Sequence, residues 1–327
     1  MKVSVLRKGL ALCLAGSSLT TGAEFVRAEG ENGVRLRRAF SEAPGVTRSE
    51  RLPRFETILA EESGLDLVIP IDDDHEDRRL YYSSMACGSV ASGDLDGDGF
   101  PELFFAAGPV ANRLYRNVGE GKALRFQPVE LAPDMADEDS WSTGSAMVDI
   151  DNDGDLDLYV CRYDAPNRLW LNDSEPGKFR FREAAARFGL DLVDASLMPS
   201  FADYDRDGDL DGFVVMNAYY RKGGRPPEGV PMRKTRTGWE VVPPMDRFFR
   251  FSSVDPATGE PSYDECGRPN RLLRNDGGFF VDVSEAAGLR PDKAHTNGSV
   301  WWDFDSDGYL DLHVANDFAA TDRCYRN

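Results

Sequence analysis

The sequence predicts an all-β fold assembled from a repeated unit of four short strands. Three observations support this prediction: an Asp-rich loop occurs four times, a short apolar run follows each copy, and an Asn-Arg-Leu signature recurs behind it. The apolar runs LFFAA, LYVC, FVV and LHVA are rich in β-branched and aromatic residues and are too short for helices. Runs of this kind predict strands.

The Asp-rich loop is clearest in DIDNDGDLD, residues 149–157, which has acidic residues at positions one, three, five and nine and glycine at position six. Ca²⁺ takes six to eight oxygen ligands at about 2.3–2.6 Å. Four carboxylates and the backbone carbonyl at position seven can supply them, and glycine permits the sharp turn. Without a cation, these carboxylates would be crowded like charges, so the pattern predicts a calcium site.

The same register occurs in loop one (94–102), loop two (149–157), loop three (203–211) and loop four (303–311). One such loop could be a solvated turn, but four in register indicate four Ca²⁺ sites. The predicted side-chain ligands are Asp94, Asp96, Asp98, Glu102, Asp149, Asp151, Asp153, Asp157, Asp203, Asp205, Asp207, Asp211, Asp303, Asp305, Asp307 and Asp311. The predicted carbonyl ligands at position seven are those of Phe100, Asp155, Asp209 and Tyr309.

An EF-hand is excluded by the residues that come after each loop. That motif needs a bidentate Glu at position twelve and flanking helices. Position twelve here is Phe105, Val160, Val214 or Val314, and the apolar runs around these residues predict strands. The loops are therefore expected to join one strand to the next.

A longer repeat surrounds each loop. The second signature reads NRLYRN (112–117), NRLWLN (167–172), NRLLRN (270–275) and DRCYRN (322–327). A strand that enters the loop, one that leaves it, one with this signature and one with Phe-x-x-Val give four strands per repeat. Four strands in about 40–60 residues are typical of a β-propeller blade. We expect about four blades over residues 53–327.

These motifs resemble a known family. The loops DIDNDGDLDLYV and DFDSDGYLDLHVAND, with NRLYRN and FVDVSEAAGL, are similar to the FG-GAP/VCBS repeats of integrin-α-like propellers. Within that group they most resemble bacterial secreted ASPIC/UnbV-type and cartilage acidic protein-like proteins. The resemblance implies a calcium-binding propeller whose metal ligands are the acidic loop positions, and it implies no particular activity.

The start of the chain has the features of a secretory signal. Residues 1–28 combine a basic start with the apolar run GLALCLAG, which is too short to span a bilayer. A short membrane anchor is the alternative. Residues 29–52 lack periodicity and are expected to form a flexible leader. We expect a secreted protein, extracellular or periplasmic, with no membrane span in the mature chain.

Four cysteines outside the signal permit two disulfides or four free thiols: Cys87, Cys161, Cys266 and Cys324. The formal charge of −19 disfavours nucleic acid as a partner. The third signature follows its loop at a much greater distance than the first two do, which implies an insertion over 218–269. This insertion is either a surface excursion or a contact region for a partner or glycan, with aromatic residues Trp239, Phe248, Phe249 and Tyr263.

No catalytic constellation is found in the sequence. The three histidines, His75, His295 and His313, are not at metal-ligand spacing, and nucleophile and phosphate-loop motifs are absent. We expect His295 in a turn and His313 packed in a strand. The first hypothesis is an exported binding or adhesion module for a protein or glycan ligand, with structural calcium. The alternative is a propeller enzyme, a lyase or hydrolase, acting on an extracellular polysaccharide.

The last expectation concerns completeness. Phe55–Leu65 is similar to Phe279–Leu289 and is expected to be the last strand of a repeat. The fourth signature ends at Asn327 without a Phe-x-x-Val strand after it. Because integrin-like propellers have seven blades, we expect a fragment or truncated product that needs roughly three more repeats. Its edge near residues 322–327 would be open.

Overall fold

The computed structural model describes residues 24–30, 33–39, 57–82, 88–119, 123–291, 293–317 and 320–327. The chain forms two compact units, Met1–Thr57 and Ile58–Asn327. In the first unit, β1 (Glu24–Gly30) and β2 (Gly33–Ala39) form an antiparallel hairpin. The rest of the predicted signal peptide and leader lies outside the described residues, and both remain predictions.

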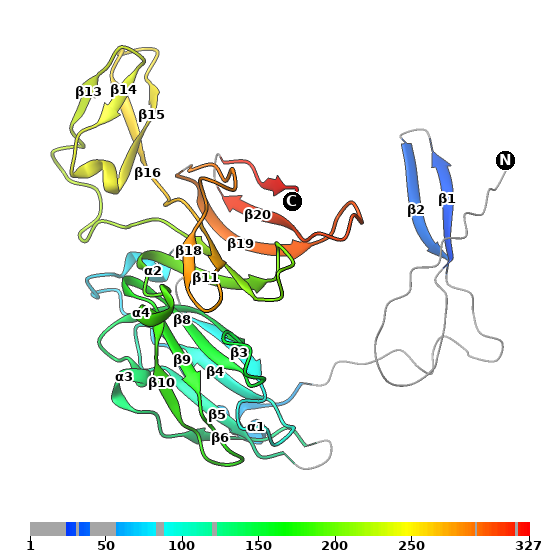
Figure 1. Cartoon of the computed structure of the whole chain (residues 1–327). Coiled ribbons are helices and arrows are strands. Elements are labelled where there is room, and N and C mark those ends of the chain that lie inside the picture. Colours follow the sequence, from blue (N-terminus) through cyan, green and yellow to red (C-terminus); the bar gives the residue numbers. More distant parts are fainter. Residues whose placement is uncertain are drawn as a thin grey trace. The chain divides into compact units, whose positions relative to one another are not determined.

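The second unit is mostly β and contains successive antiparallel sheets that follow the chain order (Figure 1). The first sheet has the order β3-β4-β5-β6. Its strands are β3 (Ser89–Gly93), β4 (Glu102–Ala106), β5 (Arg113–Asn117) and β6 (Phe126–Val129). They match the four predicted strands in order: one enters the loop, one leaves it, one carries the second signature and one closes the repeat.

The second and third repeats follow the same plan and merge into one sheet, because the far ends of β8 and β11 also pair. The second repeat contains β7 (Trp141–Val148), β8 (Asp157–Pro166), β9 (Arg168–Asn172) and β10 (Phe181–Glu183). The third contains β11 (Val193–Ala202), β12 (Asp211–Met216), β17 (Arg271–Asn275) and β18 (Phe280–Asp282). The fourth repeat contributes β19 (His295–Trp302), β20 (Asp311–Asp317) and β21 (Arg323–Tyr325).

The hydrophobic core lies between successive sheets. One cluster joins Phe104 and Leu114 of the first repeat to Leu158 and Trp170 of the second. Corresponding clusters join the second repeat to the third, and the third to the fourth. Burying a large apolar side chain contributes about 1.5–3 kcal/mol, so each sheet is stabilised mainly by its neighbours.

A single helical turn follows the last strand of the first two repeats. These turns are α3 (Pro133–Ala136) and α4 (Ala185–Phe188), and each ends in a left-handed residue. A third turn, α1 (Ala60–Ser63), ends at Gly64 with φ 78°. The expectation of a strand over Phe55–Leu65 is therefore wrong for residues 60–63, while Phe55 itself lies outside the described residues. The similar segment Phe279–Leu289 likewise turns at Gly288, with φ 79°.

Left-handed glycines place two of these turns, α1 and α4, against strands that come later in the chain. A Cβ on Gly64 would lie 2.4 Å from the carbonyl oxygen of Phe126 in β6, and one on Gly189 would lie 2.7 Å from that of Phe280 in β18. Real Cβ atoms do not approach a carbonyl oxygen so closely. Glycine is therefore needed for close approach as well as for its φ.

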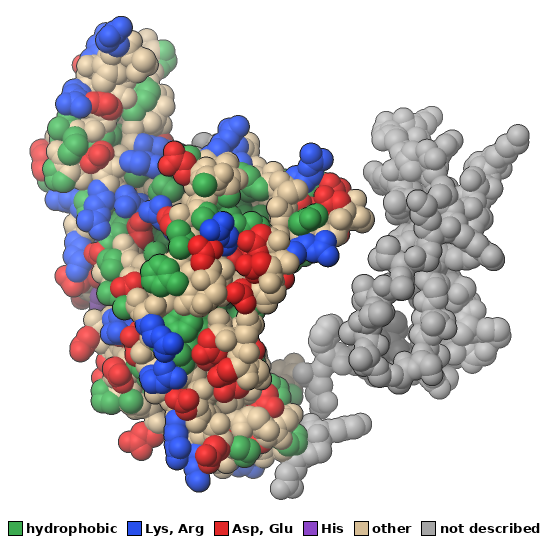
Figure 2. Space-filling view, viewed as in Figure 1, with side chains coloured by type: hydrophobic (Ala, Val, Ile, Leu, Met, Phe, Trp, Pro, Cys, Tyr) green, Lys and Arg blue, Asp and Glu red, His purple; other side chains and the backbone are tan. Residues whose placement is uncertain are grey.

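The insertion over 218–269 is structured. It contains β13 (Met232–Lys234), β14 (Trp239–Val241), the 3₁₀ turn η1 (Met245–Arg247), β15 (Phe249–Val254) and β16 (Pro261–Glu265). The two hairpins share a small core around Val230, Val241 and Phe249. The hairpins lie at the upper left of Figure 1, and Figure 2 shows Lys and Arg side chains over the same region. A further short helix, α2 (Arg79–Tyr82), precedes the first sheet.

Three cysteines lie among the described residues, and all are free thiols. Cys161 and Cys266 are buried, and Cys324 is exposed. Cys87 lies outside the described residues. Among the described helices, none has the length and apolar character needed to cross a bilayer.

Candidate metal centres

The Asp-rich loops join the strands as predicted: β3 to β4, β7 to β8, β11 to β12, and β19 to β20. Each loop has two left-handed residues, at positions four and six. Position six is the predicted glycine, with φ 89° at Gly99, 98° at Gly154, 101° at Gly208 and 94° at Gly308. Position four is Gly97, Asn152, Arg206 or Ser306, with φ between 59° and 71°. The glycine prediction is confirmed, because position six has a positive φ in every loop, near 90° to 100°, beyond the φ of about 60° at the non-glycine residues of position four.

Three of the four predicted carboxylates come together in every loop. Oxygen atoms from positions one, three and nine lie within 4.8 Å of one another. The four triads are Asp94, Asp96 and Glu102; Asp149, Asp151 and Asp157; Asp203, Asp205 and Asp211; and Asp303, Asp305 and Asp311. A cluster of three carboxylates in this small space suits a hard cation such as Ca²⁺.

The carboxylate at position five is not part of these triads. One of its oxygens instead accepts the backbone N–H of position seven. The four contacts are Asp98 to Phe100 at 2.9 Å, Asp153 to Asp155 at 3.1 Å, Asp207 to Asp209 at 2.9 Å and Asp307 to Tyr309 at 2.9 Å. The predicted ligation by position five and by the carbonyl of position seven remains a prediction.

The carboxylate at position nine is buried in every loop, although it begins a strand. One of its oxygens accepts the N–H of loop position two, and the other accepts the N–H of the Asn that ends the second signature. In loop two, Ile150 donates to Asp157 at 3.0 Å and Asn172 donates at 2.9 Å. Glu102, Asp211 and Asp311 make the same pair of contacts.

Burial has an electrostatic consequence for this position. It raises the pKa of Glu102 to about 7, the pKa of Asp157 to about 7 and the pKa of Asp211 to about 6. Neighbouring loop carboxylates raise these pKa values further, while the backbone hydrogen bonds lower them. A divalent cation at the triad would compensate these buried negative charges.

The Asn that ends the second signature is the functional residue that the sequence alone did not assign. Its side-chain amide donates to the carbonyl of loop position eight in every repeat. The contacts are Asn117 to Pro101 at 3.2 Å, Asn172 to Leu156 at 2.9 Å, Asn275 to Leu210 at 3.3 Å and Asn327 to Leu310 at 3.3 Å. The sequence does contain a signal for this residue, because an Asn ends every copy of the second signature.

The first residue of the second signature also makes a side-chain hydrogen bond that recurs in every repeat. The side-chain oxygens of Asn112, Asn167 and Asn270 accept the backbone N–H of Ala107, Arg162 and Met216. In the fourth repeat, Asp322 accepts the N–H of Asn316. An acceptor side chain at this place therefore holds the chain between the second and third strands of each repeat.

Loop three shows most directly that the residues fit a cation. In the other loops, both oxygens of the first Asp accept N–H groups of positions five and six. Oδ1 of Asp203 is buried and has no hydrogen-bond partner among the described residues. A buried carboxylate oxygen without a partner is costly, and a bound cation would compensate it.

Loops two and three are the most crowded with acidic side chains, because Asp155 and Asp209 at position seven add a fifth carboxylate to each. The buried Oδ1 of Asp155 also lacks a hydrogen-bond partner among the described residues. Burial, followed by repulsion from Asp153, raises the pKa of Asp155 to about 6. Burial, followed by the charges of Asp153 and Asp149, also raises the pKa of Asp151.

The residue before the Asn that ends the second signature (the bracing Asn) differs between the repeats and distinguishes their loops. In repeat one it is Arg116, whose guanidinium lies 2.8 Å from Asp98 and 3.2 Å from Asp96. In repeat four it is Arg326, 3.9 Å from Asp305. In repeat three Arg274 pairs instead with Asp276 at 2.6 Å. Repeat two has the buried Leu171 there, so loop two lacks a cation at this place.

Adjacent loops also contact one another. The amide of Asn172 donates to the carbonyl of Leu95 in loop one at 2.7 Å, and the amide of Asn327 donates to that of Tyr204 in loop three at 2.6 Å. Asn152 of loop two donates to Asp209 of loop three at 2.7 Å. The four loops are therefore linked as a row.

None of the three histidines belongs to a carboxylate triad. His295 is the first residue of β19 and is buried, so the turn expected there is wrong. Its Nε2 lies 3.3 Å from the carbonyl oxygen of Glu265. His313 lies in β20 as expected, 3.9 Å from Asp322. His75 packs edge-on against Trp141, with ring centroids 5.2 Å apart.

Comparison with known proteins agrees with this repeat geometry. A family model described as an FG-GAP-like repeat matches residues 94–160 and 149–214. Cartilage acidic protein 1 of Xenopus tropicalis is 27% identical over 228 residues, which cover 69% of this chain and 28% of that protein. The human protein of the same name is 26% identical over 206 residues, covering 63% of this chain and 24% of its own length. The chain thus spans about a quarter of these curated relatives.

Proposed function

We propose, for a chain with FG-GAP-like repeats and distant homology to cartilage acidic protein 1, that it is an exported calcium-binding β-propeller module that binds an extracellular protein or glycan. The observation that carries the proposal is the fourfold carboxylate triad at one place in every repeat. Calcium is assigned a structural role, and ligand binding is assigned to surfaces away from the loops.

The propeller arrangement is supported by where the core lies. Each main cluster draws side chains from two successive repeats, as stacked blades require. Every repeat also places its Asp-rich loop between its first two strands. Closure into a ring is part of the proposal.

The structural role of calcium is supported by the buried position-nine carboxylates. The triad residues would hold the ion, and calcium would supply two positive charges where burial opposes ionisation. An ion that binds only the folded chain stabilises it by linkage, by about 2.7 kcal/mol per site at a concentration 100 times its dissociation constant.

Export and an extracellular partner are supported by the basic and apolar start of the chain. A nucleic-acid partner is disfavoured by the formal charge of −19. Ligand identity is therefore sought among extracellular proteins and glycans.

The test combines calorimetry with a ligand screen. Titration of metal-free protein with Ca²⁺ should show at least two sites, and Mg²⁺ should compete poorly because it prefers a compact octahedron and keeps its waters. Fewer than two sites, or equal affinity for Mg²⁺, would contradict the calcium assignment. A protein and glycan array, probed with and without calcium, should give calcium-dependent ligands, and the absence of any ligand on both arrays would contradict the binding role.

A further inference from the structure

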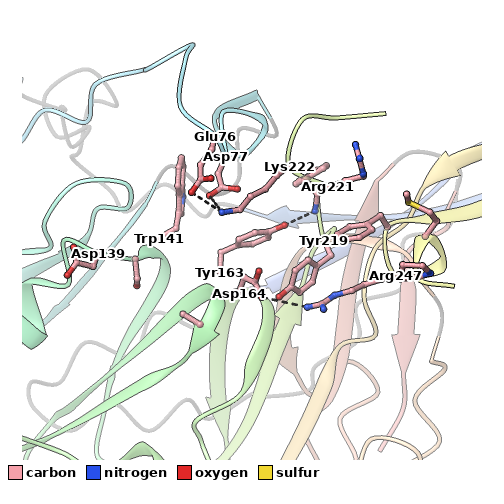
Figure 3. A pocket seen from close by; sticks show the side chains of 16 residues that line it. Glu76, Asp77, Asp139, Trp141, Tyr163, Asp164, Tyr219, Arg221, Lys222 and Arg247 are labelled. Atoms are coloured by element: carbon pink, nitrogen blue, oxygen red, sulfur yellow. Dashed lines mark hydrogen bonds and ion pairs between the residues drawn. The ribbon is translucent and has the colours of Figure 1, made fainter. Parts of the chain in front are cut away.

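A cavity of about 610 Å³ lies at the opposite end of the strands from the Asp-rich loops. Trp141 starts β7 whereas loop two comes after the end of β7, and Tyr163 lies near the far end of β8. The remaining walls come from the acidic run before α2, from the chain after β12, and from the insertion near η1 (Figure 3). Its volume is within the usual range for small-ligand sites.

Aromatic rings form much of the wall. Tyr163 and Tyr219 pack with ring centroids 5.3 Å apart, and Phe248 packs edge-on against Tyr219 at 6.2 Å. Tyr81 packs edge-on against Trp141, with ring centroids 4.9 Å apart. These packed rings offer a rigid apolar surface, and rigidity reduces the entropy lost when a ligand binds.

Two cations of the wall, Lys222 and Arg247, are already paired with carboxylates. Lys222 lies 2.9 Å from Glu76 and 3.6 Å from Asp77, and Arg247 lies 3.6 Å from Asp164 (Figure 3). The guanidinium carbon of Arg247 also lies 4.1 Å from the ring centre of Tyr219. A strongly charged ligand that bound at either pair would have to separate it. A neutral ligand can instead accept from the cation and donate to the carboxylate of the same pair.

One polar group of the cavity lacks a partner. The hydroxyl of Tyr219 is buried and makes no hydrogen bond to any described residue, although the side chain lines the cavity. The hydroxyl of Tyr163 is already engaged, because it accepts the N–H of Tyr220 at 2.6 Å. An unsatisfied buried hydroxyl is costly, and a ligand hydroxyl in the cavity would satisfy it.

We propose that this cavity binds a neutral saccharide. A sugar ring has apolar C–H faces that pack on aromatic rings. Its hydroxyl groups both donate and accept, which suits paired cations and carboxylates. The inference rests on the proposed binding function and names its ligand class and site.

The test uses the calcium-loaded full chain and a panel of short neutral oligosaccharides, with sulfated and uronic-acid oligosaccharides as the charged counter-panel. Titration calorimetry should detect a neutral saccharide, and Tyr219→Phe should weaken its binding roughly fivefold or more by removing one hydrogen bond. Arg247→Met should weaken it at least as much. Tyr263→Phe, in the insertion but outside the cavity wall, should leave the affinity unchanged.

Three outcomes would overturn the inference: no neutral saccharide binds, only charged oligosaccharides bind, or binding is unaffected by both cavity variants. The calcium-dependent melting temperature is measured on the same samples, so that misfolded variants are recognised. A calcium-dependent protein ligand without saccharide binding would overturn the cavity assignment and leave the binding module standing. Saccharide binding with no response to calcium would support the cavity and overturn the calcium role.

Discussion

Arg116 lies against Asp96, with its Nε 3.2 Å from Oδ2 of a carboxylate in the loop-one triad. A hydrogen bond from the same guanidinium also holds the pKa of Asp98 below its usual value. The side chain thus places a positive charge beside the site where a cation would bind. Loop two has Leu171 at the corresponding place, so its affinity for calcium should be higher than that of loop one.

Arg116→Met should increase the affinity of loop one for calcium. Arg116 is one-third exposed, so solvent screens its pairs with the loop carboxylates. Screened ion pairs are worth about 0.2–1 kcal/mol, which corresponds to a gain of up to roughly fivefold. Arg274→Met is the matched control, because Arg274 pairs with Asp276 outside its loop. Calcium titration calorimetry of both variants measures the effect, and an equal change in both would show that only the net charge matters.

Asp151→Ala should lower the melting temperature in calcium and have little effect in chelator. The side chain is exposed, so its truncation disturbs little packing, whereas loss of a triad member removes the linkage stabilisation of one site. Glu138→Ala, at an exposed acid outside the loops, is the control for a change of charge. Equal destabilisation by Asp151→Ala in both conditions would indicate a role in hydrogen bonding or packing instead.

Asn172→Ala should destabilise the protein with or without calcium. The variant leaves the carbonyls of Leu95 and Leu156 without their side-chain donor, at a cost of about 1–3 kcal/mol. Urea unfolding in chelator measures the loss. Asn297→Ala is the control, because its side-chain oxygen has no hydrogen-bond partner among the described residues, and a similar loss in both variants would contradict the bracing role.

Gly189→Ala should cost more stability than Gly288→Ala. Both glycines are left-handed, with φ 72° and 79°, so alanine costs about 1–2 kcal/mol of backbone strain at either position. Only at Gly189 does the new Cβ also meet a carbonyl oxygen, that of Phe280 at 2.7 Å, while no atom lies within 4 Å at Gly288. Equal melting temperatures would show that the turn after β10 does not depend on close approach to β18.

Thiol labelling should distinguish the described cysteines. Burial raises the pKa of the Cys161 and Cys266 thiols and shields them, so both should resist alkylation in the native state. Cys324 is exposed and should react quickly. Peptide mapping by mass spectrometry after brief treatment with iodoacetamide measures this, and fast labelling of Cys161 would indicate that the β8 region opens readily.

The succession of strand, loop and strand could be predicted because it depends on the residue types within each short segment. Gly154 marks the turn, and the β-branched and aromatic run after Asp157 marks a strand. The hydrogen bond from Asn172 to the carbonyl of Leu95 could not be predicted, because it joins residues 77 apart in sequence that meet only after the sheets pack. The pairing of β8 with β11 has the same origin, since Tyr163 and Ala195 are partners only through tertiary structure.

Local patterns also fail where propensities conflict. Ala60–Ser63 forms a helical turn within a segment whose first residues predict a strand. The short strands of the insertion lack an apolar repeat, and their hairpins depend on a shared core around Phe249. The cavity depends on Tyr219 and Glu76 from distant segments, so no single segment of the sequence could reveal it.

The hydrogen bond from Asn172 to the carbonyl of Leu95 bears on how such a chain can grow during evolution. A repeat cut out at its sequence boundaries would leave one loop without the amide supplied by its neighbour. A single isolated copy is therefore not self-contained, and a tandem pair keeps at least one such contact intact. Engineers who lengthen or shorten proteins of this kind should move repeats in pairs and graft the bracing Asn together with the preceding loop.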